Sequence, residues 1–323
     1  MTATDPRGTA VSDAFVVRTP TRRVDVTGGD RLDYLEDVTS QALKGADAGT
    51  VTSSLYLDPH GAPLAMFDVA VLAEKVALLT PDEAVATTLV EVLGGRTFLS
   101  QATFELTDDV VIVLRGEGAE EVAKHANLST RPGTVRPAGD AFVIGRDDGA
   151  LDIVGPAELI EDIHGLLTDA GAREGSDEDL EAWRIAAGVP GWGTEVTPPH
   201  LPEELGLLPS HVHLAKGCYP GQEAIARMWM LGRPRRRLAV VTPTAGTVHL
   251  GWQAGSGRQQ VTVTSMSPQG DVALAFVPGD AAEGSSFADE DGNSIEVARV
   301  IGADPQPPGA DPAVTRRRDK ART

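Results

Sequence analysis

The sequence changes character at Arg237, and this change restricts the possible folds more than any other feature. Before it, from about residue 13, helical and strand patterns alternate irregularly. After it, short apolar stretches are separated by Gly, Pro and Asp turns, without a helical pattern: residues 238–241, 247–250, 260–266, 272–277 and 295–301. Such a series of short strands is typical of a small β-barrel or sandwich. We therefore predict an α+β chain, with residues 13–237 as a mixed region and residues 238–303 as a β domain.

Apolar periodicity marks the helices and strands of the mixed region. It predicts helices over residues 29–38, 81–93, 157–170, 177–187 and 222–230. Ser176 and Asp179 resemble a capping box at the start of one of these helices. Strands are predicted over residues 66–73, 76–80, 98–106 and 110–114, with a hairpin made of 142–144 and 151–154.

The two ends of the chain lack the pattern of a folded segment. Residues 1–12 are small and polar, and we expect a flexible N-terminus. Residues 304–323 are rich in proline and charge and predict a disordered tail, which contains a basic run from Arg316. That run could contact an acidic partner or RNA, or could remain solvated.

Charge and cysteine content exclude several classes of protein. The formal net charge of −19 repels polyanions, so we expect no general nucleic-acid binder and no direct DNA binding. The chain has one cysteine, so no intrachain disulfide can form, and a lone thiol suits a reducing compartment. The N-terminus lacks the apolar run of a signal peptide, and no apolar run is long enough to span a membrane. We expect a cytoplasmic protein that does not bind membranes.

The motifs of several common enzyme classes are missing from the sequence. It contains no Gly-x-Ser-x-Gly elbow, no Walker phosphate loop and no His-Glu-x-x-His. His211, His213 and Cys218 could ligate zinc, but no second cysteine pair supports a structural zinc site. We expect no metal site, and we interpret these histidines as surface or hydrogen-bonded residues.

Residues 183–237 hold the densest group of unusual residues, centred on the string Lys-Gly-Cys-Tyr-Pro-Gly-Gln-Glu at residues 216–223. The ammonium group of Lys216, two residues before Cys218, would favour the thiolate form of the cysteine. The two glycines of the string allow a tight loop and close approach of a ligand, and the start of the following helix favours anions. An exposed, activated cysteine is one interpretation, and a buried structural cysteine is the other.

The string at residues 216–223 resembles the signature of the YgfZ family, whose members are related to the glycine-cleavage T-protein. Three further stretches agree with this wider superfamily: Gly-Asp-Arg at 29–31 with Tyr-Leu at 34–35, Leu-Tyr-Leu-Asp-Pro-His-Gly at 55–61 with Asp68, and Gly-Val-Pro-Gly-Trp-Gly-Thr-Glu at 188–195 with Pro-Glu-Glu-Leu-Gly-Leu at 202–207. The resemblance extends from about residue 13 to residue 302.

The resemblance implies a fold and a cofactor. Members of this superfamily resemble a three-lobed ring with a central channel that holds tetrahydrofolate. In this chain, two intertwined lobes would come from residues 13–237 and a small β-barrel from residues 238–303. The implied ligand is tetrahydrofolate or a one-carbon derivative of it.

The resemblance also implies roles for individual residues. Glu195 occupies the place of an acidic residue that contacts the pterin ring, and a carboxylate can accept paired hydrogen bonds from pterin N–H groups. Trp192 and Tyr219 could stack on the flat rings of folate or pack between lobes. Cys218 and Lys216 would carry the chemistry. The other assigned residues are Gln222 and Glu223 of the string, and arginines that suit the glutamate carboxylates of folate: Arg227, Arg235 and its neighbours at 233, 236 and 237.

Three functions are compatible with these residues. The first is a folate-binding accessory protein that supports assembly or repair of iron–sulfur clusters, including those of tRNA-modifying enzymes; its partners would be iron–sulfur client enzymes or assembly proteins. The second is an aminomethyltransferase, which would need an acid near Thr87, or Asp82 or Glu83 in its place. The third is a binding module that does not use folate. Loss of the acid together with gain of the cysteine string favours the first function, and we expect a monomer.

Overall fold

The computed structural model describes residues 13–231, 234–303 and 306–315, and these divide into two compact units. The first unit contains residues up to Tyr34, 43–52 and 67–180. The second contains residues 35–42, 53–66 and those from Glu181 onward. The predicted flexible N-terminus, Arg233 and the basic run from Arg316 lie outside the described residues.

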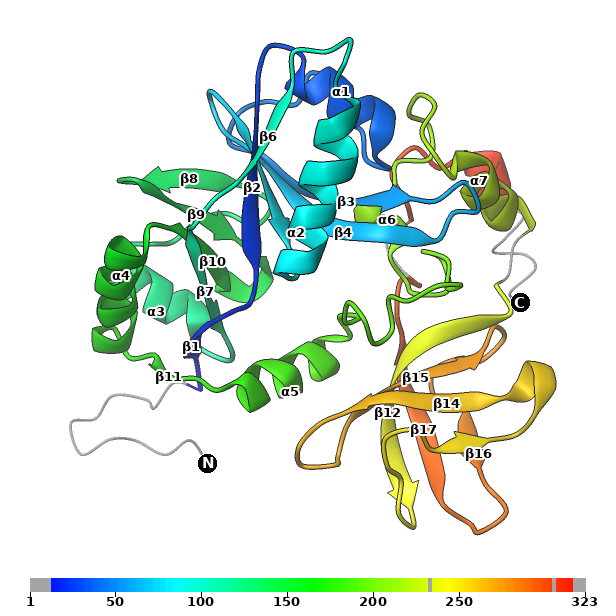
Figure 1. Cartoon of the computed structure of the whole chain (residues 1–323). Helices are drawn as coiled ribbons and strands as arrows, with labels where there is room; N and C mark the ends of the chain where they lie inside the picture. Colours follow the sequence, from blue (N-terminus) through cyan, green and yellow to red (C-terminus); the bar gives the residue numbers. More distant parts are fainter. Residues whose placement is uncertain (1–12, 232–233, 304–305, 316–323) are drawn as a thin grey trace. The chain divides into compact units, whose positions relative to one another are not determined.

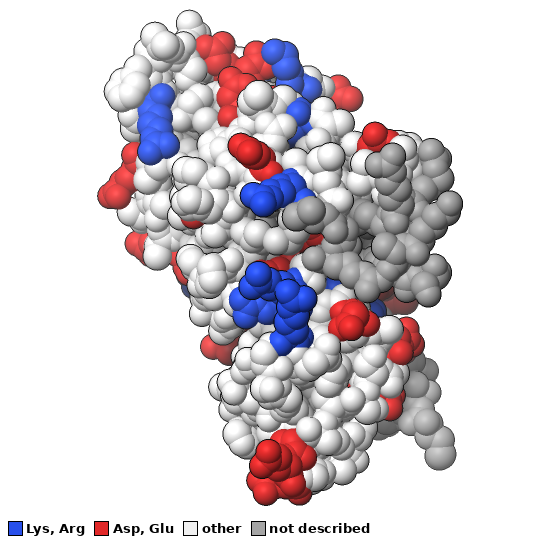
Figure 2. All heavy atoms as spheres, turned by 90° about the vertical axis from the view of Figure 1, so that its right-hand side faces the viewer, with Lys and Arg blue, Asp and Glu red and all other residues white. Residues whose placement is uncertain are grey.

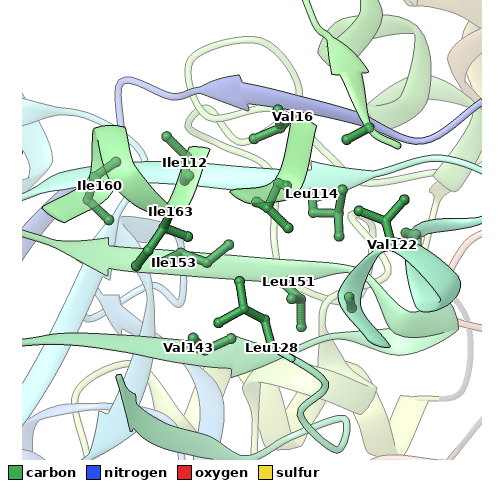
Figure 3. Packing of buried hydrophobic residues seen from close by; sticks show 14 of the residues in the cluster. Val16, Ile112, Leu114, Val122, Leu128, Val143, Leu151, Ile153, Ile160 and Ile163 are labelled. Carbon is green, nitrogen blue, oxygen red and sulfur yellow. The ribbon is translucent and has the colours of Figure 1, made fainter. Parts of the chain in front are cut away.

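The first unit contains a six-stranded sheet with the order β11-β1-β7-β10-β9-β8. These strands are β11 (Arg173–Glu174), β1 (Phe15–Arg18), β7 (Val110–Arg115), β10 (Leu151–Gly155), β9 (Ala141–Gly145) and β8 (Val135–Ala138). Two helices, α3 (Ala119–His125) and α4 (Ala157–Asp169), contribute to the core of this sheet. In Figure 3, Ile160 and Ile163 of α4 lie over Ile112 and Ile153 of the sheet, and all four side chains are buried.

Buried charges in this unit are paired. The Asp152 carboxylate accepts hydrogen bonds from Arg115 Nη2 at 2.5 Å and Arg146 Nε at 2.8 Å. Arg146 also pairs with Asp68, the aspartate that follows the 55–61 motif in the sequence. Burial would raise the pKa of Asp152, but the two guanidinium groups outweigh burial and lower the pKa to about 2. Asp68 therefore belongs to a structural ion network of the first unit.

A five-stranded sheet has the order β3-β4-β5-β2-β6. Its strands are β3 (Val51–Leu57), β4 (Pro63–Val71), β5 (Val76–Thr80), β2 (Arg22–Thr27) and β6 (Thr103–Leu106). Helix α1 (Arg31–Val38) follows β2, and α2 (Glu83–Thr88) follows β5 and continues as a π-helix (Leu89–Leu93) and a 3-10 turn (Gly94–Arg96). The strand predicted over 98–106 is wrong in its first part, because Phe98 and Leu99 lie exposed in a loop.

The second unit contains a six-stranded antiparallel sheet with the order β13-β14-β15-β12-β17-β16 (Figure 1). Its strands are β13 (Gln253–Ala254), β14 (Val261–Met266), β15 (Ala273–Pro278), β12 (Arg236–Ala245), β17 (Ser294–Val300) and β16 (Ser286–Ala288). Shifts of register interrupt the pairing of β12 with β17 and of β14 with β15, which adds curvature. The predicted α+β class with a barrel-like C-terminal sheet is confirmed, whereas the strand predicted over 247–250 is wrong.

Three helices precede or carry the motif residues: α5 (Asp177–Ala187), whose residues from Glu181 onward belong to the second unit, α6 (Leu208–His211) and α7 (Gln222–Leu231). The predicted capping box is confirmed, because the Ser176 hydroxyl accepts the Asp179 amide at 3.2 Å and the Ser176 amide donates to the Asp179 carboxylate at 2.9 Å. Within the part of the chain that the structure describes, no helix has the length and apolarity needed to cross a membrane.

Part of the predicted disordered tail is folded. Residues 306–315 pack on the second unit and end in a helical turn at 312–315. Pro307 is buried, and Ala310 and Val314 contact a core cluster that includes Leu208. The proline-rich composition predicted disorder. The few apolar residues of this segment nevertheless pack against the core cluster of the second unit.

Candidate functional site

The motif string, residues 216–223, forms the end of the loop between α6 and α7 and the first two residues of α7 in the second unit (Figure 1). Cys218 lies in this loop as a free thiol whose exposure excludes the interpretation as a buried structural cysteine, while its activation stays a prediction. Gly217 beside it has open space where a Cβ would stand. An exposed thiol on an uncrowded loop is accessible to a second molecule, so the surroundings of this loop define the candidate site.

Lys216 points away from solvent and caps the end of helix α1. Its side chain is fully buried, and its ammonium group donates to the carbonyl oxygens of Glu36 and Thr39, the latter at 2.6 Å. These carbonyls lie at the C-terminal end of α1, where backbone acceptors have no partner within the helix. Burial lowers the pKa of Lys216, against the opposing charges of Glu36 and Asp37. The ammonium group thus has structural partners that the sequence did not indicate.

Tyr219 connects the motif loop to a hydrophobic core. It is buried among residues of the second unit, and its ring lies 4.8 Å from the Lys216 Nζ, a cation–π distance. Burial raises the pKa of Tyr219 to about 12. Trp192 is half-buried against the same core cluster. Both aromatic side chains contribute to packing in this structure, and stacking of either on a folate ring stays a prediction.

The loop at residues 58–61 packs against the start of α7, so two of the motifs found in the sequence meet in space. Gly221 has a φ of +80°, and a Cβ there would lie 2.6 Å from the Asp58 carbonyl oxygen and 3.0 Å from the Gly61 Cα. A Cβ on Gly61, whose φ is +87°, would lie 3.0 Å from the Ala224 Cβ. Asp58 shapes its own loop by accepting the amides of residues 60 and 62 through Oδ1. Both glycines are therefore required for close backbone approach.

Glu195 is the centre of a buried hydrogen-bond network. Its side chain has 0% exposure, Oε1 accepts from the Ser265 hydroxyl at 2.6 Å, and Oε2 accepts from the Gly191 amide at 2.8 Å. Oε2 also accepts from the Thr194 hydroxyl at 3.0 Å and from Arg184 Nη1 at 3.2 Å. Burial would raise the pKa of Glu195, but these hydrogen bonds and the arginine charge lower it. The carboxylate joins α5, its following loop and β14.

The remaining predicted residues lie at the surface of the second unit. Glu223, Arg227 and Arg235 are exposed, while Gln222 is half-buried and begins α7. Figure 2 shows one face of the molecule on which a few Lys and Arg side chains gather between acidic groups. The two arginines that follow Arg235 have protein contacts. Arg237 is buried, and Arg236 Nε lies 3.4 Å from the Glu204 carboxylate. Among the described arginines of the predicted set, Arg227, Arg235 and Arg236 are thus exposed, and Arg227 and Arg235 are the two that we test below.

An aminomethyltransferase needs an acid near residue 87, and the two candidates, Asp82 and Glu83, both have other contacts in this structure. The Asp82 carboxylate caps α2 by accepting the Val85 amide at 2.8 Å. Glu83 is exposed and lies 3.6 Å from Arg22, and Thr87 is exposed without a carboxylate. Within the described ranges, no group of three or more His, Cys, Asp or Glu side chains is arranged to hold a metal ion.

Two comparisons with known proteins find relatives, while no family model matches the chain. The chain is 24% identical over 226 residues to the tRNA-modifying protein YgfZ of Vibrio atlanticus (strain LGP32), which covers 70% of this chain and 68% of the relative. It is 23% identical over 280 residues to the protein of the same name from Aliivibrio fischeri (strain MJ11), covering 82% and 85%.

Among solved structures, the chain is similar to the glycine cleavage system aminomethyltransferase T from Bartonella henselae. The TM-score is 0.75 at 18% identity, with 92% of this chain and 88% of the other covered. At this identity the match establishes the fold. The resemblance inferred from residues 216–223 is therefore confirmed by relatives in sequence and by a neighbour in structure.

Proposed function

Since this chain is a homologue of the YgfZ proteins with the fold of the T-protein, we propose that it binds tetrahydrofolate or a one-carbon derivative and acts as an accessory protein in tRNA modification. In this role it supports assembly or repair of the iron–sulfur clusters of tRNA-modifying enzymes, and Cys218 is its reactive group. The observation that carries the proposal is the exposed thiol of Cys218, the one cysteine of the chain, in the motif that resembles the family signature.

The surroundings of Cys218 support a thiol that meets another macromolecule. The loop that carries it is fixed beneath by Tyr219 in the core and by Lys216 at the end of α1. The thiol itself is exposed. The loop thus presents the thiol to solvent while the side chains on either side of it stay in contact with the protein. An iron–sulfur client or assembly protein is the partner class that this proposal requires.

The aminomethyltransferase alternative has less support. It needs a free acid on the helix that follows β5, and Asp82 is used as the N-cap of that helix. Glu83, the next acid, is exposed and close to Arg22. Glycine-cleavage activity, assayed with a lipoyl carrier protein, separates the two functions, because the accessory protein has none.

Calorimetric titration with tetrahydrofolate tests the folate half of the proposal. We expect the wild type to bind and Cys218→Ala to retain the affinity of the wild type. With a polyglutamylated folate, Arg227→Gln and Arg235→Gln should each weaken binding by about three- to five-fold, as expected for the loss of one partly exposed charge pair. Arg258→Gln, a change at an exposed arginine in the same unit but outside the motif, is the matched control. Absence of binding by the wild type would overturn the folate assignment.

Measurement of tRNA nucleosides tests the other half. Cells that lack this protein should show a deficit in the modified nucleosides made by iron–sulfur enzymes, as measured by mass spectrometry of bulk tRNA. Wild type should restore them and Cys218→Ala should not, although that variant still binds folate. Full restoration by Cys218→Ala would remove the cysteine from the mechanism.

A further inference from the structure

Residues 306–315, which we call the strap, lie directly against the chain that leads into the Cys218 loop. The Leu214 amide donates to the Pro308 carbonyl oxygen at 2.8 Å. A Cβ on Gly309 would lie 2.6 Å from the Ala215 amide nitrogen and 2.8 Å from His213 Cε1. Gly309 also has a φ of +72°, which disfavours other residues. The strap therefore reaches residues 213–215 by close backbone contact that only glycine allows.

Apolar side chains and a capped turn anchor the remainder of the strap. Ala310 and Val314 contact the core cluster that contains Tyr219 and Trp229. The Asp311 carbonyl oxygen accepts the amide of residue 315 at 2.9 Å, and its carboxylate accepts the amide of residue 313 at 2.7 Å. These contacts are specific, but the apolar groups are small, so the strap can open at a lower free energy than that of global unfolding.

The Cys218 loop is held independently by residues from the region of α1. The His213 amide donates to the Ser40 carbonyl oxygen at 3.0 Å, and Lys216 Nζ donates to the Thr39 carbonyl oxygen. The approach to Cys218 is thus fixed by two segments, one within the fold and one at its C-terminal end. The first segment includes the end of helix α1, whereas the second follows the last strand of the β domain.

We propose that the strap is a releasable restraint on the Cys218 loop: docked, it holds residues 213–215 and limits the motion of the cysteine, and released, it frees the loop for reaction with a partner. This inference rests on the proposed role of Cys218 as the reactive group but not on folate binding, and the labelling rate below tests the restraint apart from either. The proposal assigns a role to the proline- and glycine-containing segment that follows β17, the last strand of the β domain.

The rate of Cys218 labelling by a chromogenic aromatic disulfide tests the proposal. Because the chain has one cysteine, the absorbance change reports Cys218 alone. Deletion of residues 306–323 and the substitution Gly309→Val should each raise the rate at least about three-fold, as expected for loss of a local restraint. Deletion of residues 316–323 leaves the strap in place and should leave the rate unchanged. Equal rates in all four proteins, or slower labelling without the strap, would overturn the proposal.

Hydrogen exchange of the intact wild type gives a second measurement that needs no variant. If the strap opens as a unit, the amides of Leu214 and Ala310 should exchange with the same opening free energy, below that of the β12 amides. Addition of a synthetic peptide of residues 306–323 to the deletion variant should return the labelling rate toward that of the wild type. A Leu214 amide as protected as the β12 amides would show that the strap does not open, and the proposal would fail.

Discussion

At the scale of single residues, the structure separates groups that anchor the fold from groups that are open to a ligand. Glu195 and Lys216 are both charged, both belong to motifs, and both are fully buried with protein partners. Cys218, Arg227 and Arg235 are exposed. The sequence predicted a functional role for all five residues. It could not predict which of them are buried and which are exposed, because burial depends on which segments meet in the fold.

Glu195 is expected to contribute to stability as an ionised group. Glu195→Ala leaves Arg184 and Ser265 without their buried acceptor and should lower the free energy of unfolding by about 3 kcal/mol, measured by urea denaturation at pH 7. Glu195→Gln preserves the shape and should cost less. Glu83→Gln, a change at an exposed carboxylate, is the control and should stay within about 0.5 kcal/mol of the wild type.

The effect of Glu195 should depend on pH in a defined direction. Its pKa in the folded state lies below the ordinary value of 4.5, so the stability it contributes is fully present above about pH 4.5. That contribution is lost as the pH falls through the folded-state pKa. The difference in unfolding free energy between wild type and Glu195→Gln should therefore shrink in acid. A difference that grows below pH 4 would contradict this linkage.

Lys216 should act through helix α1. Lys216→Met retains the apolar stem but removes the donor to the carbonyls of Glu36 and Thr39, and should lower the free energy of unfolding by about 2 kcal/mol. Amides near the end of α1 should also exchange faster in the variant. Lys44→Met, a change at an exposed lysine, is the matched control. An unchanged free energy of unfolding would mean that water replaces the ammonium group as hydrogen-bond donor to these carbonyls without a net cost.

At the scale of elements, the regular segments could be predicted and their ends and irregular parts could not. The helices over 157–169 and 177–187 and the hairpin of β9 and β10 were evident because their periodicity and turns agree. The helix predicted over 81–93 begins two residues later and changes to a π-helix after residue 88, which apolar spacing does not encode. The apolar residues Phe98 and Leu99 led to a strand prediction, but both are exposed, because none of the described elements covers them.

The two glycines of the motif loop should differ sharply in their tolerance of substitution. Gly221→Ala places a Cβ against the Asp58 carbonyl in a left-handed conformation and should lower the free energy of unfolding by at least about 2 kcal/mol. Gly217→Ala meets nothing within 4 Å and should be nearly neutral. Thermal unfolding of the two variants provides an internally matched comparison. Equal losses would show that the Gly221 turn relaxes more easily than its contacts indicate.

At the scale of the whole molecule, the net charge of −19 disfavours direct binding to tRNA, so within the proposed function the protein would act through a protein partner. We expect non-specific binding to bulk tRNA or duplex DNA at 150 mM salt to be weaker than about 0.1 mM, the weak end of the usual range. Fluorescence anisotropy with labelled tRNA would measure this. Submicromolar binding at that salt concentration would instead require a basic surface that dominates the overall charge.

The overall architecture could be predicted from the sequence, but the set of segments that forms each compact unit could not. The switch to short strands after Arg237 predicted the C-terminal β domain, and the motif string predicted the T-protein fold. No local pattern shows that residues 35–42 and 53–66 group with the C-terminal half of the chain. Such grouping arises from long-range packing, which a reading of local periodicity cannot detect.

The close approach of Gly61 and Gly221 has a consequence for how the sequences of homologues can vary. A Cβ on Gly221 would stand 3.0 Å from the Gly61 Cα, and a Cβ on Gly61 would stand 3.0 Å from the Ala224 Cβ, three residues further along the same stretch. A lineage that replaces one of them must rebuild the opposing loop, so the stretches around residues 58–61 and 216–224 should vary together among homologues. The cysteine would then be inherited as part of a two-piece unit, and relatives that lose the string should also have altered the loop that faces it.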